Sequence, residues 1–179
     1  MTILAGDILA VRGTSWLSRG ILKATGNTVS HVGIITATSP IIEVTEALIR
    51  VKTNPIDVSI ADDDIEWAAV LQDKTLTDSE RITIVEAALQ FSSDSYNYGA
   101  ILLQLLNSNF NTTWFTDHLS FGMNGRPICS YVAAESYSKT GRNFGVEDRT
   151  TTPADIYEYS IYNSDKYLEY IVKHSLIFG

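Results

Sequence analysis

The sequence is poor in cysteine and histidine, and this shortage excludes several classes of site. Its 179 residues include one cysteine and three histidines. A single cysteine cannot form a disulfide within the chain. A closed structural zinc site takes four Cys or His ligands, which here would consume all of these residues, so such a site is not expected.

Positive charge and long apolar runs are also scarce. The chain has 13 Lys and Arg against 21 Asp and Glu, a net charge of −8. Nucleic acids and anionic membrane surfaces attract basic stripes, so neither is an expected partner. Only residues 100–106 are densely apolar, too few to cross a bilayer. The N-terminus has neither a basic region nor a long apolar region of a cleavable signal peptide. We therefore expect a cytoplasmic protein, or one exported without a cleavable signal peptide, and no stable membrane insertion.

The composition that remains is typical of one globular domain spanning residues 1–179. Apolar residues make up 45% of the chain, and no repeat or linker interrupts it. The apolar periodicity predicts an α+β fold, with its strands clustered early and helices before and after them. Strands are expected at 8–11, 31–36, 41–44 and 67–71, with 48–51 continuing or pairing beside the third. Helices are expected at 16–24, 77–91, 100–106 and 128–139, with one helical turn at 153–159.

The sequence gives further detail for the helix over 77–91, for the loop over 107–126 and for the C-terminal segment. In the helix over 77–91, Thr77 and Glu80 have the spacing of a capping box. Ile82, Val85 and Leu89 then fall on one face. Residues 107–126 are polar and aromatic and predict a long loop that covers a cleft. Residues 167–178 predict a last strand or helix.

Cys129 lies at or near the first turn of the predicted helix over 128–139. Free N–H groups and the positive end of the helix dipole favour an anion there, which lowers the pKa of a thiol. Val132, Ala133, Ser136 and Tyr137 share its face. Cys129 is therefore either a nucleophile facing a cleft or a small buried apolar residue.

A nucleophilic cysteine needs a base, and three histidines are available. His118 lies in the polar loop and His174 lies near the C-terminal end of the chain. His31 begins an apolar strand, and Gly33 follows it on the same face. Because Gly33 has no side chain, another group can approach the imidazole. These observations favour His31 as the base.

The imidazole needs an orienting partner on its second nitrogen, and Glu43 and Glu46 are the candidates. An antiparallel hairpin centred on Ala37 places Glu43 directly opposite His31. A later centre places Glu46 across from the histidine face instead. Because Pro40 cannot donate to a strand ladder, a turn ending near it is favoured. The register argument favours Glu43 and keeps Glu46 as the alternative.

An ordered set of motifs links these residues to a known family. The segments GDILAVRG, SHVGIIT, IIEVTEA, YNYGAIL, ICSYVAAESY and TTPADIYEYS follow one another in the chain. This order resembles the circularly permuted branch of the NlpC-type papain-like cysteine hydrolases, distantly related to lecithin:retinol acyltransferase. The resemblance runs from about Gly6 to Ser160. It implies a permuted papain-like fold, in which a small antiparallel sheet packs against helices and the nucleophile begins a helix.

The resemblance also implies site residues and an activity. Cys129 would be the nucleophile, His31 the base, Glu43 the orienting residue and Tyr98 a cleft residue. The expected reaction is hydrolysis of peptide amides, peptidoglycan peptides foremost, through an acyl-enzyme and without a metal or organic cofactor. One alternative is a lipid-directed thioesterase, phospholipase or acyltransferase on the same site, with residues 100–106, Trp114, Phe115 and Phe121 lining an apolar groove. The other is a non-catalytic binding protein on a degenerate scaffold.

Overall fold

The computed structural model describes residues 2–25, 29–47, 51–61, 64–93, 129–148 and 150–174 of the chain. This part is α+β, with a six-stranded sheet in which every neighbouring pair is antiparallel. The strands, in the order β4-β3-β2-β1-β5-β6 across the sheet, are β1 (Ile8–Gly13), β2 (His31–Ala37), β3 (Glu43–Ala47), β4 (Val51–Pro55), β5 (Ile65–Asp73) and β6 (Tyr167–His174). The helices are α1 (Trp16–Thr25), α2 (Ile56–Ile60), α3 (Asp78–Ser93), α6 (Cys129–Ser138) and α7 (Pro153–Tyr162).

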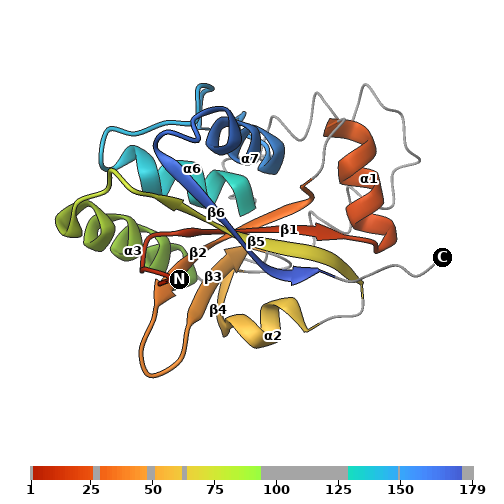
Figure 1. The fold of residues 1–179 in the computed structure, drawn as a ribbon, viewed down its shortest axis with the longest axis horizontal. Helices are drawn as coiled ribbons and strands as arrows, with labels where there is room; N and C mark the ends of the chain where they lie inside the picture. Colours follow the sequence, from red (N-terminus) through yellow and green to blue (C-terminus); the bar gives the residue numbers. More distant parts are fainter. Residues whose placement is uncertain are drawn as a thin grey trace.

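The sheet has an apolar layer on each face. Helices α3, α6 and α7 lie on one side and the short helix α2 lies on the other (Figure 1). Alternating residues of the central strands β1, β2 and β5 supply the two layers. The larger layer includes Ile8, Ala10, Val32, Ile34, Leu71, Ile84, Ala133, Tyr137 and Ile156. The layer on the α2 side includes Leu9, Val11, Ile35, Val44, Ile56, Ala68 and Val70.

Helix α3 confirms the predicted capping box, but the face that carries Ile82 and Leu89 is not the one that packs against the sheet. The Thr77 N–H donates to Oε2 of Glu80 at 2.8 Å, and the Glu80 N–H donates to Oγ1 of Thr77 at 3.3 Å. Ile82 is 59% exposed, however, while Ile84 is fully buried. The helix turns its other apolar stripe inward because Arg81, beside that stripe, forms a buried ion pair with Asp7.

Other element predictions hold in part. The third strand begins at Glu43, two residues later than predicted. Neither β4 with these bounds nor α2 is predicted from the sequence. The C-terminal element is a strand, β6. Helix α7 is ten residues long rather than one turn, because Thr152 caps it in a second capping box and Pro153 occupies its first turn. The predicted elements over 100–106 and 107–126 lie outside the described residues.

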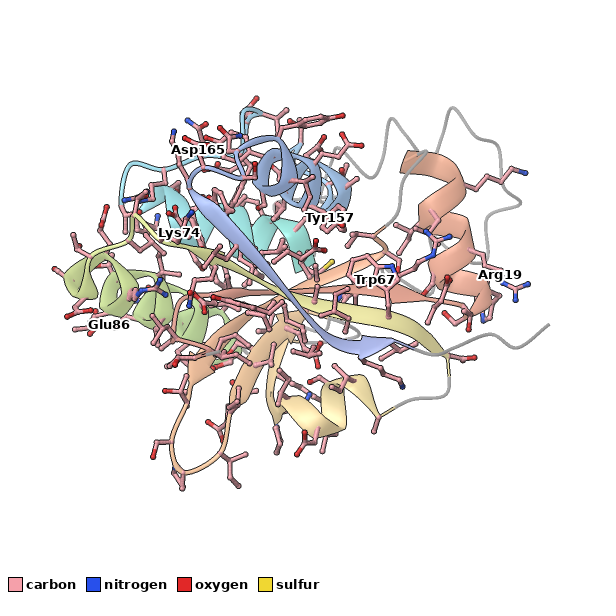
Figure 2. The ribbon with its side chains drawn as sticks, in the orientation of Figure 1. Arg19, Trp67, Lys74, Glu86, Tyr157 and Asp165 are labelled. Atoms are coloured by element: carbon pink, nitrogen blue, oxygen red, sulfur yellow. The ribbon has the colours of Figure 1, made fainter. Side chains whose placement is uncertain are left out.

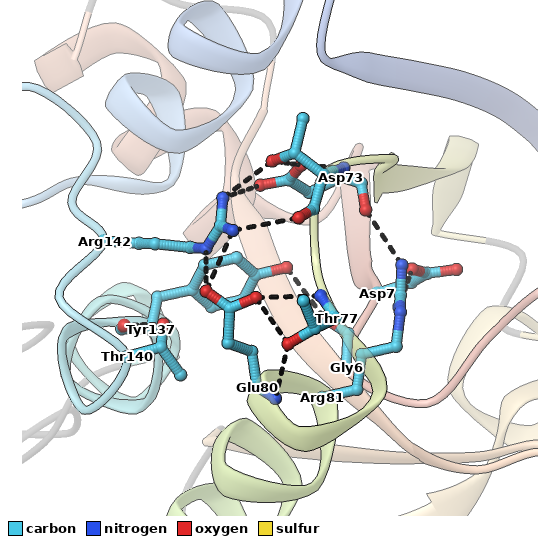
Figure 3. A network of polar contacts seen from close by, with 10 residues as sticks. Gly6, Asp7, Asp73, Thr77, Glu80, Arg81, Tyr137, Thr140 and Arg142 are labelled. Atoms are coloured by element: carbon cyan, nitrogen blue, oxygen red, sulfur yellow. Dashed lines mark hydrogen bonds and ion pairs between the residues drawn. The ribbon is translucent and has the colours of Figure 1, made fainter.

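A buried polar network connects α3 and α6 to the start of β1 (Figure 3). The Tyr137 hydroxyl, from α6, donates to the Gly6 carbonyl at 2.7 Å. Arg81, from α3, donates to Oδ1 of Asp7 at 2.7 Å. The network therefore anchors α6, the helix that begins at Cys129, against the sheet. Among the described residues, no helix is long and apolar enough to cross a membrane.

Candidate active site

Cys129 is the first residue of α6 and is half-buried at the edge of β2. The face it shares with Val132, Ala133, Ser136 and Tyr137 is buried, as the spacing predicts. Backbone N–H groups of Val32 and Ser130 donate to its sulfur. The pairing of β2 with β3 begins at Gly33, one residue after Val32. The sulfur therefore contacts the β2 backbone just before the residues of β2 that pair with β3.

The imidazole of His31 is hydrogen-bonded to the Cys129 sulfur, and each group changes the acidity of the other. Burial acts against the imidazolium, but the Cys129 thiolate and the Glu46 carboxylate outweigh it and raise the pKa of His31 to about 10. Burial likewise acts against the thiolate, but the imidazolium and the two backbone donors outweigh it and lower the pKa of Cys129. The contact therefore favours the thiolate–imidazolium form of the pair over the neutral form.

The carboxylate that contacts His31 is Glu46, and the prediction that Glu43 lies opposite His31 is wrong. Nε2 of His31 lies 2.9 Å from Oε2 of Glu46, whose side chain is 4% exposed. Glu43 pairs instead with Ala37, at the far end of the ladder. The turn occupies residues 38–42, so the hairpin is centred later than Ala37 and each residue of β3 lies further along β2 than predicted. Because Nε2 faces Glu46, Nδ1 is the nitrogen left for the sulfur.

Because Gly33 has no side chain, Glu46 can pack closely against β2 at this position. The two residues are cross-strand partners on the face of β2 that also carries His31. A Cβ atom added at Gly33 would lie 2.6 Å from Cγ1 of Val44 and 3.2 Å from Cβ of Glu46. The gap predicted beside the imidazole is therefore present, and the side chain of Glu46 reaches His31 beside it.

Two further polar residues contact the site, and the sequence analysis misses both. Oε1 of Glu46 accepts hydrogen bonds from Oγ of Ser59 at 2.8 Å and from Nδ2 of Asn54 at 3.2 Å. Burial acts to raise the pKa of the Glu46 carboxyl, but the bonds from His31, Ser59 and Asn54 lower it overall. A correct register for β4 would find Asn54, since Lys52 pairs with Glu46 and Asn54 follows two residues later on the same face.

The other predicted candidates are Tyr98, His118 and His174. Tyr98 and His118 lie outside the described residues. His174 ends β6 opposite Trp67. Trp67 also contacts Tyr157 of α7, with ring centroids 5.5 Å apart (Figure 2). This half-buried pair packs against the same apolar layer as Cys129.

Comparison with known proteins supports the fold and leaves the family open. No known protein family matches the chain, and no curated protein is similar to it. One similar solved structure is that of the metalloprotein YiiX from Escherichia coli O157:H7, a DUF1105 protein. It aligns with a TM-score of 0.63 at 18% identity, covering 98% of this chain and 99% of YiiX. At this identity the likeness shows a shared α+β architecture over nearly the whole length of both chains.

The contacts of Glu46 predict which carboxylate sets the protonation of His31. In Glu46→Gln the imidazolium loses its buried counter-charge, so the pKa of His31 is expected to fall by about 1–3 units. Glu43→Gln, the matched change three residues away on β3, is expected to leave that pKa unchanged. Nuclear magnetic resonance (NMR) titration of the His31 ring measures both. An equal fall in the two variants would contradict the assignment.

Proposed function

We propose that this protein is a cysteine hydrolase on a permuted papain-like fold, with Cys129 as nucleophile, His31 as base and Glu46 as orienting carboxylate. The observation that carries the proposal is the chain of contacts from the Cys129 sulfur through the imidazole to the buried carboxylate. A structural cysteine has no need of an adjacent imidazole, whereas a nucleophile needs both the base and a group that orients it.

The site supports acyl transfer through the thiolate. The sulfur would attack a carbonyl carbon, and the carbonyl oxygen would take the negative charge. Backbone N–H groups at the start of α6, that of Cys129 among them, would stabilise this oxyanion. His31 would then deliver its proton to the leaving amine or alkoxide, leaving an acyl group on the sulfur. Water, deprotonated by His31, would release the acid and restore the thiolate.

Peptide amides are the proposed substrates, with peptidoglycan peptides first. This choice rests on the resemblance of the ordered motifs from GDILAVRG to TTPADIYEYS. The metal that the name of YiiX ascribes to that protein finds no comparable support here. Among the described residues, no three His, Cys, Asp or Glu side chains are grouped to hold a metal ion.

Trapping of an acyl-enzyme tests the proposal directly. The wild-type protein is incubated with disaccharide-peptide fragments of peptidoglycan and, separately, with fluorogenic acyl esters, and both products and intact mass are measured. We expect an acyl adduct on Cys129 and cleavage of the amide substrate. Cys129→Ala should form no adduct and lose about 10³-fold or more of the activity.

The controls separate the competing functions. Glu43→Gln should keep the wild-type rate, since Glu43 pairs at the far end of the hairpin. Cleavage of esters but not peptides, still dependent on Cys129, would select a lipid-directed enzyme. Activity that survives in Cys129→Ala would refute the assignment of Cys129 as the nucleophile. An unreactive thiol in the wild-type protein would refute the proposal that the protein is a cysteine hydrolase.

A further inference from the structure

The Glu46 carboxylate is held on both of its oxygens. Oε2 faces Nε2 of His31 at 2.9 Å, while Oε1 accepts from Ser59 and Asn54 at 2.8 and 3.2 Å. The side chain is 4% exposed, so these protein donors replace water around the anion. Because a carboxylate is planar, two donors on one oxygen restrict its rotation and direct the other oxygen at the imidazole.

The two donors come from one short unit of the fold. Asn54 lies in β4, and Ser59 lies in α2, which follows β4 directly. Ile56 of α2 is buried in the apolar layer on this side of the sheet, and its N–H donates to the Ile42 carbonyl at 2.8 Å. These contacts hold α2 against the sheet, so that the Ser59 hydroxyl reaches a carboxylate thirteen residues earlier in the chain.

We propose that Ser59 and Asn54 are positioning residues of the active site, which act on His31 through Glu46. They keep the carboxylate charged and in line with Nε2, and the carboxylate in turn keeps the imidazole charged and aimed at Cys129. This role rests on the proposed function. It extends the site from three residues to five and gives a role to α2 and to β4, the strand that pairs with β3.

Two other charged residues lie on β4 and α2, and the variants that test this proposal change neither of them. Lys52 is the cross-strand partner of Glu46, and Asp57 lies in the first turn of α2. Both are exposed to solvent. Since neither is changed in the variants, any field that they exert on His31 cancels between the variants and the wild-type protein.

A double-mutant cycle on the pKa of His31 tests the proposal. The ring of His31 is titrated by NMR in wild type, Ser59→Ala, Asn54→Leu and Glu46→Gln, and in each single variant combined with Glu46→Gln. Ser59→Ala and Asn54→Leu are expected to lower the pKa of His31 by about one unit or less, against about 1–3 units for Glu46→Gln. In the Glu46→Gln background both effects should vanish, because the donors act only through the carboxylate.

Two controls distinguish positioning from a general loss of stability. Ser59→Thr keeps the hydroxyl and should keep the wild-type pKa of His31. Val58→Ala changes an exposed neighbour in α2 and should leave that pKa unchanged even if it lowers the melting temperature. Effects of Ser59→Ala and Asn54→Leu that persist without the Glu46 charge would overturn the proposal, as would unchanged pKa values in both variants.

The wild-type titration separates this proposal from the function on which it rests. A wild-type His31 that titrates near the ordinary value of about 6.5 would remove the thiolate–imidazolium pair, and with it both proposals. A wild-type His31 that stays charged well above that value, together with unresponsive Ser59 and Asn54 variants, would overturn the positioning role alone.

Discussion

The His31→Ala variant is expected to react with iodoacetamide roughly tenfold more slowly than the wild-type protein at pH 6. The reason is the contact between the imidazole and the Cys129 sulfur, which lowers the pKa of the thiol. Without the imidazolium, burial acts on the thiol with only the backbone donors Val32 and Ser130 against it. Its pKa should therefore rise towards the ordinary value of about 8.5, where only about 0.3% is ionised at pH 6.

At alkaline pH the His31→Ala variant should react faster than the wild-type protein, the reverse of the difference at pH 6. A thiolate of higher pKa is intrinsically more nucleophilic, with a Brønsted coefficient of about 0.4–0.5, so part of the loss at low pH is returned once the thiol is fully ionised. The two rate profiles are thus expected to cross between pH 6 and pH 10. A variant that reacted uniformly faster or slower at every pH would indicate a change in exposure, and the ion pair would be refuted.

The sequence predicts the local positions of the two candidate residues, Cys129 and His31, because local signals place each of them. Cys129 begins a helix, and its neighbours on one face are apolar, which fixes the direction of the side chain. His31 begins an apolar strand with Gly33 on the same face. Both patterns depend on periodicities of 3.6 and 2 residues, which need no knowledge of the rest of the fold. The structure confirms both positions and brings the side chains together.

The carboxylate that contacts His31 is harder to predict because it depends on pairing. Glu43 and Glu46 are three residues apart, so they point to opposite faces of β3, and the hairpin centre decides which one approaches His31. That centre depends on how many residues the turn holds. The sequence signal, Pro40, marks the turn but does not show that residues 38–42 all belong to it. The short helix α2, and with it Ser59, has no apolar period long enough to predict.

The buried face of α3 shows a different limit of sequence reasoning. Two apolar stripes compete on this helix, one through Ile82 and Leu89 and the other through Ile84 and Ala88. Periodicity alone does not rank them. The stripe beside Arg81 faces the sheet because the Arg81 guanidinium forms an ion pair with the buried carboxylate of Asp7. A long-range ion pair of this kind leaves no local signal in the sequence.

That ion pair is also expected to be the most sensitive point for stability. The Asp7 side chain is fully buried and accepts from Arg81 at 2.7 Å, from the Leu4 N–H at 2.8 Å and from Gln72 at 2.9 Å. Arg81→Met would leave the carboxylate buried without its cation. We expect it to reduce the free energy of unfolding by about 3–5 kcal/mol at pH 8, measured by urea denaturation.

The loss should be smaller at pH 5. Burial is the strongest influence on the Asp7 carboxyl and raises its pKa above the ordinary value, against the bonds from Leu4, Arg81 and Gln72. A carboxyl with a raised pKa in the folded state favours folding in its protonated form. This contribution is complete below the unfolded-state pKa and is lost as the pH rises through the higher, folded-state pKa. Removing Arg81 takes away an opposing cation, so the variant should regain stability as Asp7 takes up a proton.

Arg142→Met is the matched control, since both arginines belong to the network in Figure 3. Arg142 bonds to Asp73 at 3.0 Å and Glu80 at 2.9 Å, but its side chain is 26% exposed against 10% for Arg81. Water can replace its contacts, so a smaller loss with little dependence on pH is expected. Equal losses for the two variants would show that the cost comes from severed hydrogen bonds in general. A larger loss of stability in Arg81→Met than in Arg142→Met, reduced at pH 5, would show that the loss comes from leaving the buried Asp7 carboxylate without a cation.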